Sequence, residues 1–324
     1  MYTNNRLIFK CFEKLFNALP LAENINMQFE WKGVFPALLT PFTKNDQLDL
    51  DMFEKNLQAQ IDAGIHGIIL GGSLGEASTI TDKEKEELVE FSVEYINGSM
   101  PVILNIAESS TKDAIAQAAN AKKWGADGIM LLPPMRYKTD DRETMSYFKT
   151  VAASTDLPIM IYNNPVDYKI DARPELFEQL LECENVTALK ESSRDVTNLT
   201  RMKNLYGDRF KVLCGVDTLA MEELCLGADG WVAGLVCAFP KETVTIYNLV
   251  KAGKIEEAIQ IYRWFMPLLE LDIHPKLVQY IKLAATQTGI GSEYVRSPRL
   301  VLAGEERERI LDIINKGISN RPAL

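Results

Sequence analysis

The sequence predicts a (β/α)8 barrel (a TIM barrel) with a C-terminal helical extension. From Gly33 onward, short apolar runs bounded by Gly, Pro or Asp alternate with segments of helical period. The runs begin roughly every 20–35 residues, the spacing of strand–helix units. Eight such runs are present: Val34–Leu39, Gly67–Leu70, Pro101–Ile106, Gly128–Leu132, Pro158–Tyr162, Val186–Leu189, Phe210–Cys214 and Gly230–Val236.

The character of these runs favours a closed parallel barrel. They are apolar on both faces, as strands are when helices cover a parallel sheet. An open doubly wound sheet is the main alternative, and it calls for a glycine-rich phosphate turn after the first strand. That position holds Thr40-Pro41-Phe42-Thr43, which is not such a turn.

The segments between the runs are typical of helices. Thr81 and Glu84 form a capping-box pattern, and the Ala-rich segment Thr111 to Trp124 stops before Gly125. Further helices are predicted over Asp171–Leu181, Val196–Tyr206, Thr218–Leu226, Glu242–Lys251, Ile255–Leu271, Pro275–Thr288 and Glu305–Lys316. We therefore expect a barrel over residues 29–252 and a C-terminal helical extension over 253–324. Residues 1–28 are expected to be a poorly ordered N-terminal extension.

Composition excludes several classes of protein. The net charge of −10 disfavours nucleic-acid and anionic-membrane partners. The odd number of cysteines, five, includes no CxxC pair, which suits a reducing, cytoplasmic location. The two histidines leave little material for a histidine metal site or a Ser-His-Asp triad, and His66 is interpreted as structural. No apolar run reaches the roughly 18 residues that a membrane span needs.

Lys190 closes the sixth apolar run, where a barrel strand reaches its active-site end. A strand-end lysine can simply extend into solvent. A lysine in a desolvated barrel mouth instead has a lowered pKa and becomes a nucleophilic amine, as imine chemistry requires. Tyr162 closes the neighbouring fifth run, so its phenol can stand beside Lys190 and relay protons. A core tyrosine with a locally bonded hydroxyl is the alternative.

The second run ends in a glycine-rich turn, Gly71-Gly72-Ser73-Leu74-Gly75-Glu76. Glycines allow successive backbone N–H groups to point toward an anion, and Ser73 adds a hydroxyl. The spacing does not match a dinucleotide fingerprint. The turn is interpreted as a carboxylate-binding site.

These features together resemble the dihydrodipicolinate synthase / N-acetylneuraminate lyase family of Schiff-base lyases and aldolases, from Phe29 to about Leu302. Gly-Ser-Leu-Gly-Glu resembles the family's pyruvate-carboxylate loop, Tyr162 its proton-relay tyrosine and Lys190 its Schiff-base lysine. Gly215-Val216-Asp217 is similar to its Gly-x-Asp turn. The resemblance implies catalytic roles for Lys190, Tyr162 and Ser73, a homo-oligomer (dimer or tetramer), and neither cofactor nor metal.

Three departures from dihydrodipicolinate synthase concern the substrate. Leu74 replaces a second hydroxyl residue, and Met135-Arg136 replace a tyrosine pair. Asp167 stands where the synthase has an arginine for the far carboxylate of its aldehyde, and an acid cannot bind that group. The pattern is most similar to the branch that includes 1-pyrroline-4-hydroxy-2-carboxylate deaminase. The substrate-binding residues expected on this reading are Gly72, Leu74, Gly75, Arg136, Asp167 and Gly215.

The expected reaction converts the cyclic imine 1-pyrroline-4-hydroxy-2-carboxylate to 2,5-dioxopentanoate and ammonia through Lys190. Arg136 or Ser73 would orient the carboxylate or hydroxyl, and Asp167 would face a developing ammonium. Alternatives are a 2-keto-3-deoxy sugar acid aldolase or dehydratase, and 4-hydroxy-tetrahydrodipicolinate synthase itself. A barrel that binds phosphorylated ligands near Ala228-Asp229-Gly230, and a non-enzymatic ligand-binding barrel, also stay open.

Overall fold

The computed structural model describes residues 29–134 and 136–324, of which Trp31–Leu324 form one compact unit. The expected N-terminal extension lies outside the described residues. Eight strands are present in this unit: β1 (Gly33–Pro36), β2 (Ile68–Leu70), β3 (Val102–Ile106), β4 (Gly128–Leu131), β5 (Ile159–Asn163), β6 (Val186–Glu191), β7 (Lys211–Cys214) and β8 (Gly230–Ala233).

The strands form one parallel sheet in the order β1-β8-β7-β6-β5-β4-β3-β2. The two ends of this sheet meet, because Ala37 pairs with Ile69 in a parallel bridge just after β1. The N–H of Leu38 donates to the carbonyl of Ile69 at 2.9 Å in the same place. The predicted (β/α)8 barrel is therefore confirmed.

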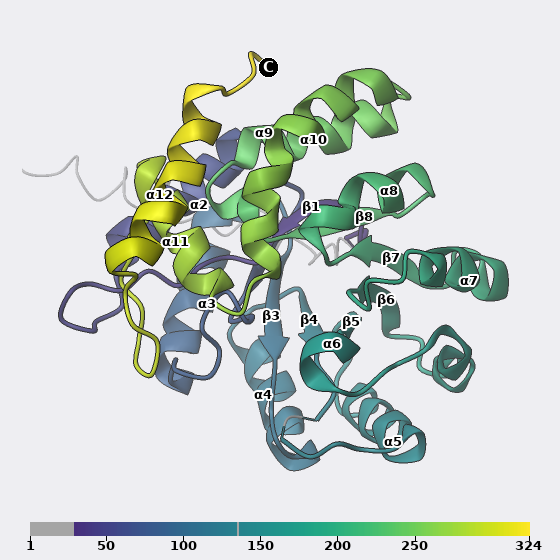
Figure 1. Cartoon of the computed structure of the whole chain (residues 1–324). Helices are drawn as coiled ribbons and strands as arrows, with labels where there is room; N and C mark the ends of the chain where they lie inside the picture. Colours follow the sequence, from purple (N-terminus) through teal and green to yellow (C-terminus); the bar gives the residue numbers. More distant parts are fainter. Residues whose placement is uncertain (1–28, 135) are drawn as a thin grey trace, which may run out of the picture. The chain divides into compact units, whose positions relative to one another are not determined.

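Helices connect the strands and surround the barrel (Figure 1). Their starts follow the capping chemistry of the sequence: Thr81 and Asp140 each form a complete capping box, and Ser110 accepts a hydrogen bond from the N–H of Asp113. The barrel helices are α2 (Leu50–Asp62), α3 (Asp82–Ile96), α4 (Thr111–Lys123), α5 (Asp141–Ala152), α6 (Pro165–Tyr168), α7 (Thr197–Tyr206), α8 (Ala220–Cys225) and α9 (Pro240–Lys251).

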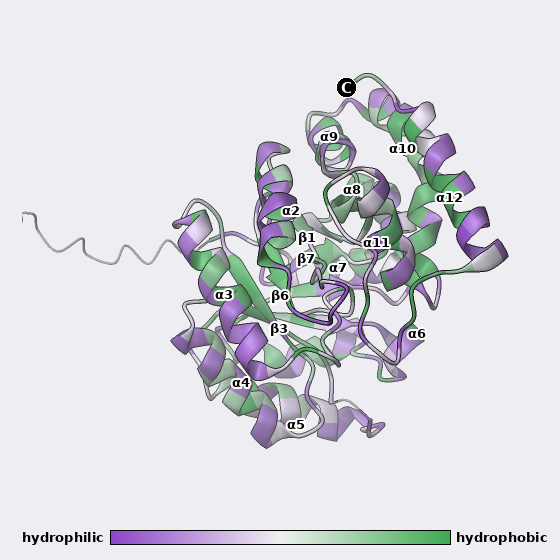
Figure 2. Ribbon diagram, turned by 90° about the vertical axis from the view of Figure 1, so that its left-hand side faces the viewer, coloured by the Kyte–Doolittle hydropathy of each residue, from purple (hydrophilic) through white to green (hydrophobic). Residues whose placement is uncertain are grey.

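The core lies inside the barrel and between the strands and their helices. Apart from Thr187 and Lys211, every strand residue is buried, so both faces of the strands are covered. Figure 2 shows this as hydrophobic strands at the centre and helices that turn hydrophilic residues outward. Removing this apolar surface from water is the main force that favours the fold.

The C-terminal helices follow α9 and lie on one side of the barrel, away from α4 and α5 (Figure 1). They are α10 (Ile255–Leu269), the 3-10 turn η4 (Glu270–Ile273), α11 (Leu277–Gln287) and α12 (Gly304–Ser319). The indole of Trp264 donates to the carbonyl of Gly317 at 3.0 Å, which joins α10 to α12. We call α10, η4, α11 and α12 the C-terminal layer. Among the described residues, no helix is both long and apolar enough to cross a membrane.

Some predicted boundaries were wrong. Residues expected to form a helix over Asp171–Leu181 form only a 3-10 helix, η1 (Pro174–Leu180). It starts at Pro174 because a proline disfavours helical geometry in the residue before it. The eighth strand was expected to reach Val236 but ends at Ala233. Beyond it, Gly234 and Leu235 direct their N–H groups to the carboxylate of Asp217 instead of a neighbouring strand.

Candidate active site

A cavity of about 570 Å³ opens at the carboxyl ends of the strands, where barrel enzymes place their active sites. Strands, strand-end loops and the C-terminal layer all contribute to its wall. The residues that matter below are Gly72, Ser73, Leu74, Tyr162, Asn164, Asp167, Tyr168, Lys190, Ser192, Arg194, Gly215, Gly234 and Asp272.

Lys190 and Tyr162 face each other in this cavity because their strands are hydrogen-bonded neighbours. The two residues are direct partners in the β5–β6 register, so both side chains leave the sheet on the same side. The Nζ of Lys190 lies 4.1 Å from the centre of the Tyr162 ring. Only 7% of Lys190 is exposed, and burial lowers the pKa of its amine. A larger fraction of neutral, nucleophilic amine follows.

Gly215 makes room for the lysine stem. A Cβ at this position would lie 2.6 Å from Cε and 2.7 Å from Cγ of Lys190, and 2.1 Å from Oγ of Ser192. The aliphatic stem of Lys190 therefore crosses directly over the glycine that follows β7. The structure thus places Gly215 in the cavity wall, against the lysine stem.

The phenol of Tyr162 is held in a small polar cluster. Asn164 Nδ2 donates to the Tyr162 hydroxyl at 3.1 Å and to Asp167 Oδ2 at 2.7 Å. Burial raises the pKa of Tyr162 to about 12, so the phenol keeps its proton at neutral pH. Tyr168 packs edge-on against the Tyr162 ring, with 5.7 Å between centroids. A protonated phenol beside an amine can donate to an oxygen that leaves the attacked carbon.

The turn after β2 forms the opposite part of the wall. Ser73 Oγ and the Tyr168 hydroxyl lie 2.7 Å apart, and Leu74 presents an apolar side chain. No hydrogen bond between described residues uses the N–H of Ser73 or of Leu74. Gly71 has φ +64°, the left-handed geometry that favours glycine. The turn therefore retains free donors for an anion.

Two of the expected substrate-binding residues lie elsewhere. Gly75 packs into the turn itself, where a Cβ would come within 3.1 Å of the Gly71 N and the Leu38 carbonyl. Arg136 is exposed, with φ +74°, and borders a second cavity that also touches Ser73 and Tyr168. The structure does not bring either residue to the cavity of Lys190, because Gly75 packs inside its own turn and Arg136 lies in a wall shared with α4.

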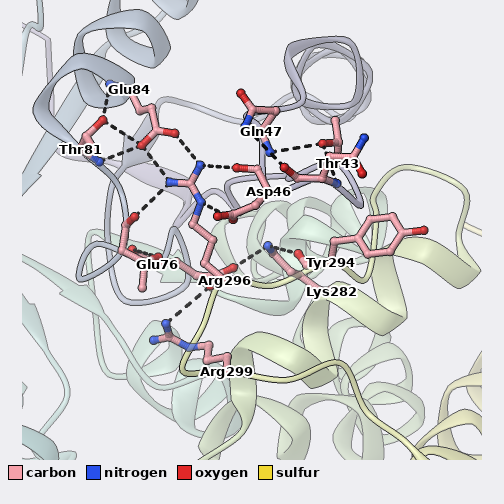
Figure 3. A network of polar contacts seen from close by, with 12 residues as sticks. Thr43, Asp46, Gln47, Glu76, Thr81, Glu84, Lys282, Tyr294, Arg296 and Arg299 are labelled. Atoms are coloured by element: carbon pink, nitrogen blue, oxygen red, sulfur yellow. Dashed lines mark hydrogen bonds and ion pairs between the residues drawn. The ribbon is translucent and has the colours of Figure 1, made fainter.

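The turn after β2 is attached to the C-terminal layer by a buried ion pair (Figure 3). Glu76 Oε1 lies 2.5 Å from Lys282 Nζ, and neither side chain has exposed surface. Glu76 Oε2 accepts the N–H of Arg296 at 3.1 Å and lies 3.5 Å from the Arg299 guanidinium. Arg296 in turn binds Glu84 and Asp46. This network fixes the position of the turn that carries Ser73.

Sequence reasoning missed Asn164, Ser192 and Gly234, each directly after a strand, and three residues farther from the strand ends. Tyr168 reaches it from the short helix α6, and Arg194 stands exposed on the rim with φ +68°. Asp272 enters from η4 in the C-terminal layer. No motif marks these three residues, since each depends on a loop path rather than on a strand end. Asp167, which was expected, lies on the exposed rim, held by its backbone N–H to Asn164 Oδ1 at 3.2 Å.

Other expectations concern residues away from the cavity. His66 is structural as interpreted, because its Nδ1 accepts the N–H of Val34 at 3.2 Å at the opposite end of the strands. Asp229 lies at that same end, where it accepts the N–H of Val212 and pairs with Lys203, so it does not border the cavity of Lys190. Across the described part of the chain, no three His, Cys, Asp or Glu side chains are grouped as metal ligands.

A parallel barrel with a buried lysine at the carboxyl ends of its strands has the architecture of a (β/α)8-barrel enzyme. Comparisons with known proteins identify the family. The profile of the Dihydrodipicolinate synthetase family matches residues 30–317. The chain is 31% identical over 290 residues to 4-hydroxy-tetrahydrodipicolinate synthase of Methanothrix thermoacetophila, covering 88% of this chain and 97% of the relative. It is 33% identical over 275 residues to the enzyme of that name from Exiguobacterium sibiricum, covering 84% and 92%.

Solved structures agree with these relatives. Dihydrodipicolinate synthase DapA-2 of Bacillus anthracis has a TM-score of 0.86 at 27% identity, covering 91% of this chain and all of that one. The chain belongs to the Dihydrodipicolinate synthetase family. It is accordingly a lyase of a family that uses Schiff-base chemistry. These relatives are named as synthases, and none of these names supports the pyrroline-carboxylate deaminase branch expected from the sequence.

Proposed function

We propose that Lys190 forms a Schiff base with C2 of a 2-oxo acid or of the matching cyclic imine. The observation that carries this proposal is the buried Nζ of Lys190, 4.1 Å from the ring centre of Tyr162 inside an open cavity. A desolvated amine is nucleophilic, and a neighbouring phenol can exchange protons with the carbinolamine. Ser73 and the free N–H groups of its turn receive the substrate carboxylate.

For the particular substrate, we infer a 1-pyrroline-4-hydroxy-2-carboxylate that is converted to 2,5-dioxopentanoate and ammonia. Lys190 attacks C2 and opens the ring, which leaves a primary amine on C5. A proton leaves C3 and the 4-hydroxyl departs as water. Tautomerisation then moves the new C3–C4 double bond to C5, where the primary amine becomes an imine. Hydrolysis of this imine releases ammonia, and hydrolysis of the lysine adduct frees the product.

The charges around the cavity support this substrate over a dicarboxylate. Asp167 stands at the exposed rim, where a substrate ammonium finds a favourable partner. Leu74, in place of a hydroxyl residue, leaves an apolar surface for ring carbons. Arg136, which was expected to orient the substrate, borders the second cavity, so this mechanism assigns no step to it.

A second candidate, 4-hydroxy-tetrahydrodipicolinate synthase, is favoured by two observations. The relatives of that name match this chain over more than nine tenths of their length. Arg194, on the rim of the cavity, offers a guanidinium for a second carboxylate although Asp167 occupies the position of the expected arginine. Both candidates use the same lysine and differ in whether ammonia is released.

Borohydride reduction in the presence of each candidate substrate tests the proposal. We expect a mass increase on the Lys190 peptide, and none in Lys190→Ala, which should lose nearly all turnover. The retained carbon skeleton identifies the substrate. Ammonia release from the pyrroline supports the deaminase, whereas consumption of pyruvate with an aldehyde partner supports the synthase. Full turnover by Lys190→Ala would contradict both.

A further inference from the structure

Asp272 is a carboxylate of the cavity that the steps above leave without a role. It lies on η4, between α10 and α11, and lines the cavity together with Lys190 and Gly215. Its Oδ1 occupies the space above Gly234, only 2.3 Å from where a Cβ of that residue would be. Asp272 therefore rests on the end of β8, and glycine at 234 permits its approach.

This position is next to the lysine. The stem of Lys190 crosses over Gly215 at the end of β7, and Asp272 covers Gly234 at the end of β8. The two strands are hydrogen-bonded neighbours, and such strands lie about 4.8 Å apart. Lys190 and Asp272 thus line the same cavity, close enough for their charges to interact.

Asp272 also differs from the other buried acid nearby, Asp217. The carboxylate of Asp217 accepts hydrogen bonds from the N–H groups of Trp231, Gly234 and Leu235, at 2.8 to 3.2 Å. No hydrogen bond or ion pair between described residues reaches the carboxylate of Asp272. The carboxylate of Asp272 lines the open cavity, where a ligand can pair with it. Asp217 has a structural role, whereas Asp272 is free to act on a ligand.

We propose that Asp272 is the catalytic acid–base residue that moves the proton at C3 of the Lys190 adduct. The proposal rests on the proposed Schiff base. It assigns proton transfer at C3 to Asp272 and proton transfer at the C2 oxygen to Tyr162. Burial raises the pKa of Asp272 well above its usual value, which brings its proton affinity closer to that of a carbon acid activated by an iminium.

The steps balance without another reactant. The Asp272 carboxylate takes a proton from C3, and the C–H electron pair moves into a C2–C3 double bond as the iminium becomes an enamine. In the deaminase reaction, the enamine electrons return to form a C3–C4 double bond while the C4–O bond breaks. The departing oxygen takes the proton from Asp272 and leaves as water. With a simple 2-oxo acid, the enamine regains a proton at C3.

Exchange of the C3 protons of pyruvate for deuterium, followed by proton NMR in heavy water, tests the assignment. Exchange is divided by the amount of borohydride-trapped Lys190 adduct measured in parallel. We expect Asp272→Asn to retain the trapped adduct and to lose exchange by about 100-fold. The exposed neighbour Glu270 carries the same charge on the same turn, so Glu270→Gln is the matched control and should exchange at the rate of the unmodified protein.

A second variant tests position rather than chemistry. Gly234→Ala keeps the carboxylate but displaces it, so exchange should fall while the adduct persists. Asp272→Asn that exchanges at the unmodified rate per adduct would overturn the role of Asp272, and so would adduct formation without exchange in the unmodified protein. Absence of any adduct with pyruvate or the pyrroline would instead overturn the proposed Schiff base, and the assignment with it.

Discussion

At the scale of single residues, the cavity depends on where a side chain is missing. Lys190 can lie across the barrel mouth because Gly215 has no Cβ. If a side chain at position 215 displaced the lysine stem, the Nζ of Lys190 would move toward the more solvent-accessible part of the cavity. Its amine would then regain its usual pKa and lose nucleophilicity at neutral pH.

Gly215→Ala should therefore impair catalysis more than folding. The new Cβ would lie 2.6 Å from Cε of Lys190, and the flexible stem has to move. We expect the turnover number to fall by at least about tenfold, which is a barrier change of about 1.4 kcal/mol. Steady-state kinetics and the pH dependence of adduct trapping measure this effect, and a thermal melt reports on the fold. An unchanged trapping profile would show that the stem does not need this space.

The sequence identified the residues whose position follows from a strand. Lys190 and Tyr162 each lie at the carboxyl end of an apolar run, and neighbouring strands in a barrel bring such ends together. Asp272 could not be predicted in the same way. It lies 82 residues after Lys190 in the chain, and its approach depends on how the C-terminal layer folds back over β8.

At the scale of elements, the buried pair Glu76–Lys282 joins the turn after β2 to α11 (Figure 3). Burial lowers the pKa of Lys282 to about 8, while the Glu76 carboxylate favours the charged amine. The pair also packs near Phe42, whose ring centre is 4.5 Å from the Lys282 Nζ. Because the desolvation cost of each charge is balanced mainly by the other, the pair is sensitive to loss of one member.

Lys282→Met should destabilise the protein by about 3 kcal/mol, because it leaves a buried carboxylate with weaker partners. Urea unfolding measures the change. Adding Glu76→Gln removes the uncompensated charge, so the double variant should be more stable than Lys282→Met alone. A double variant that loses the sum of both single effects would contradict this coupling.

Element boundaries were predicted well where local chemistry decides them. The capping box at Thr81, which the sequence predicted, begins its helix by hydrogen bonds within four residues. The end of β8 was predicted less well, because the carboxylate of Asp217, on another strand end, takes the N–H groups that would have continued it. When a residue that is distant in the chain binds these N–H groups, the sequence around the strand end carries no pattern that predicts it.

At the scale of the whole molecule, the buried acid Glu223, which lies near the buried Glu191, makes the free energy of unfolding depend on pH. Glu223 on α8 is 2% exposed, and its Oε2 has no partner among the described residues. Burial, and then the nearby Glu191, raise the pKa of Glu223 from 4.5 to about 8. The folded protein thus retains a proton that the unfolded chain releases, and stability from this group falls as pH rises from about 4.5 to about 8.

Glu223→Gln should flatten that part of the stability profile. One proton retained only in the folded state changes the unfolding free energy by up to about 1.4 kcal/mol per pH unit. Urea titrations at several pH values measure the slope. The exposed neighbour Glu222 provides the control Glu222→Gln, which should leave the slope unchanged. A slope that survives Glu223→Gln would place its origin in another group.

The architecture as a whole followed from the regular alternation of apolar runs and helices, because eight strands covered on both faces close into a barrel. The oligomeric state of the protein does not follow from this alternation. Homo-oligomer formation, cytoplasmic location and the domain division at residue 252 accordingly stay predictions. Leu300 and Val301, exposed at 75% and 43%, are apolar residues at the surface of the described chain.

The arrangement of η4 has a consequence for how this protein acquires its activity during synthesis. Lys190, Tyr162 and Ser73 are synthesised well before Asp272, so the eight strands can be made before the segment that completes the cavity wall. The complete cavity therefore arises only when η4 lies over the strand ends. Because η4 lies outside the eight strands, a change around Asp272 alters the cavity wall while the strand pairing of the barrel stays intact.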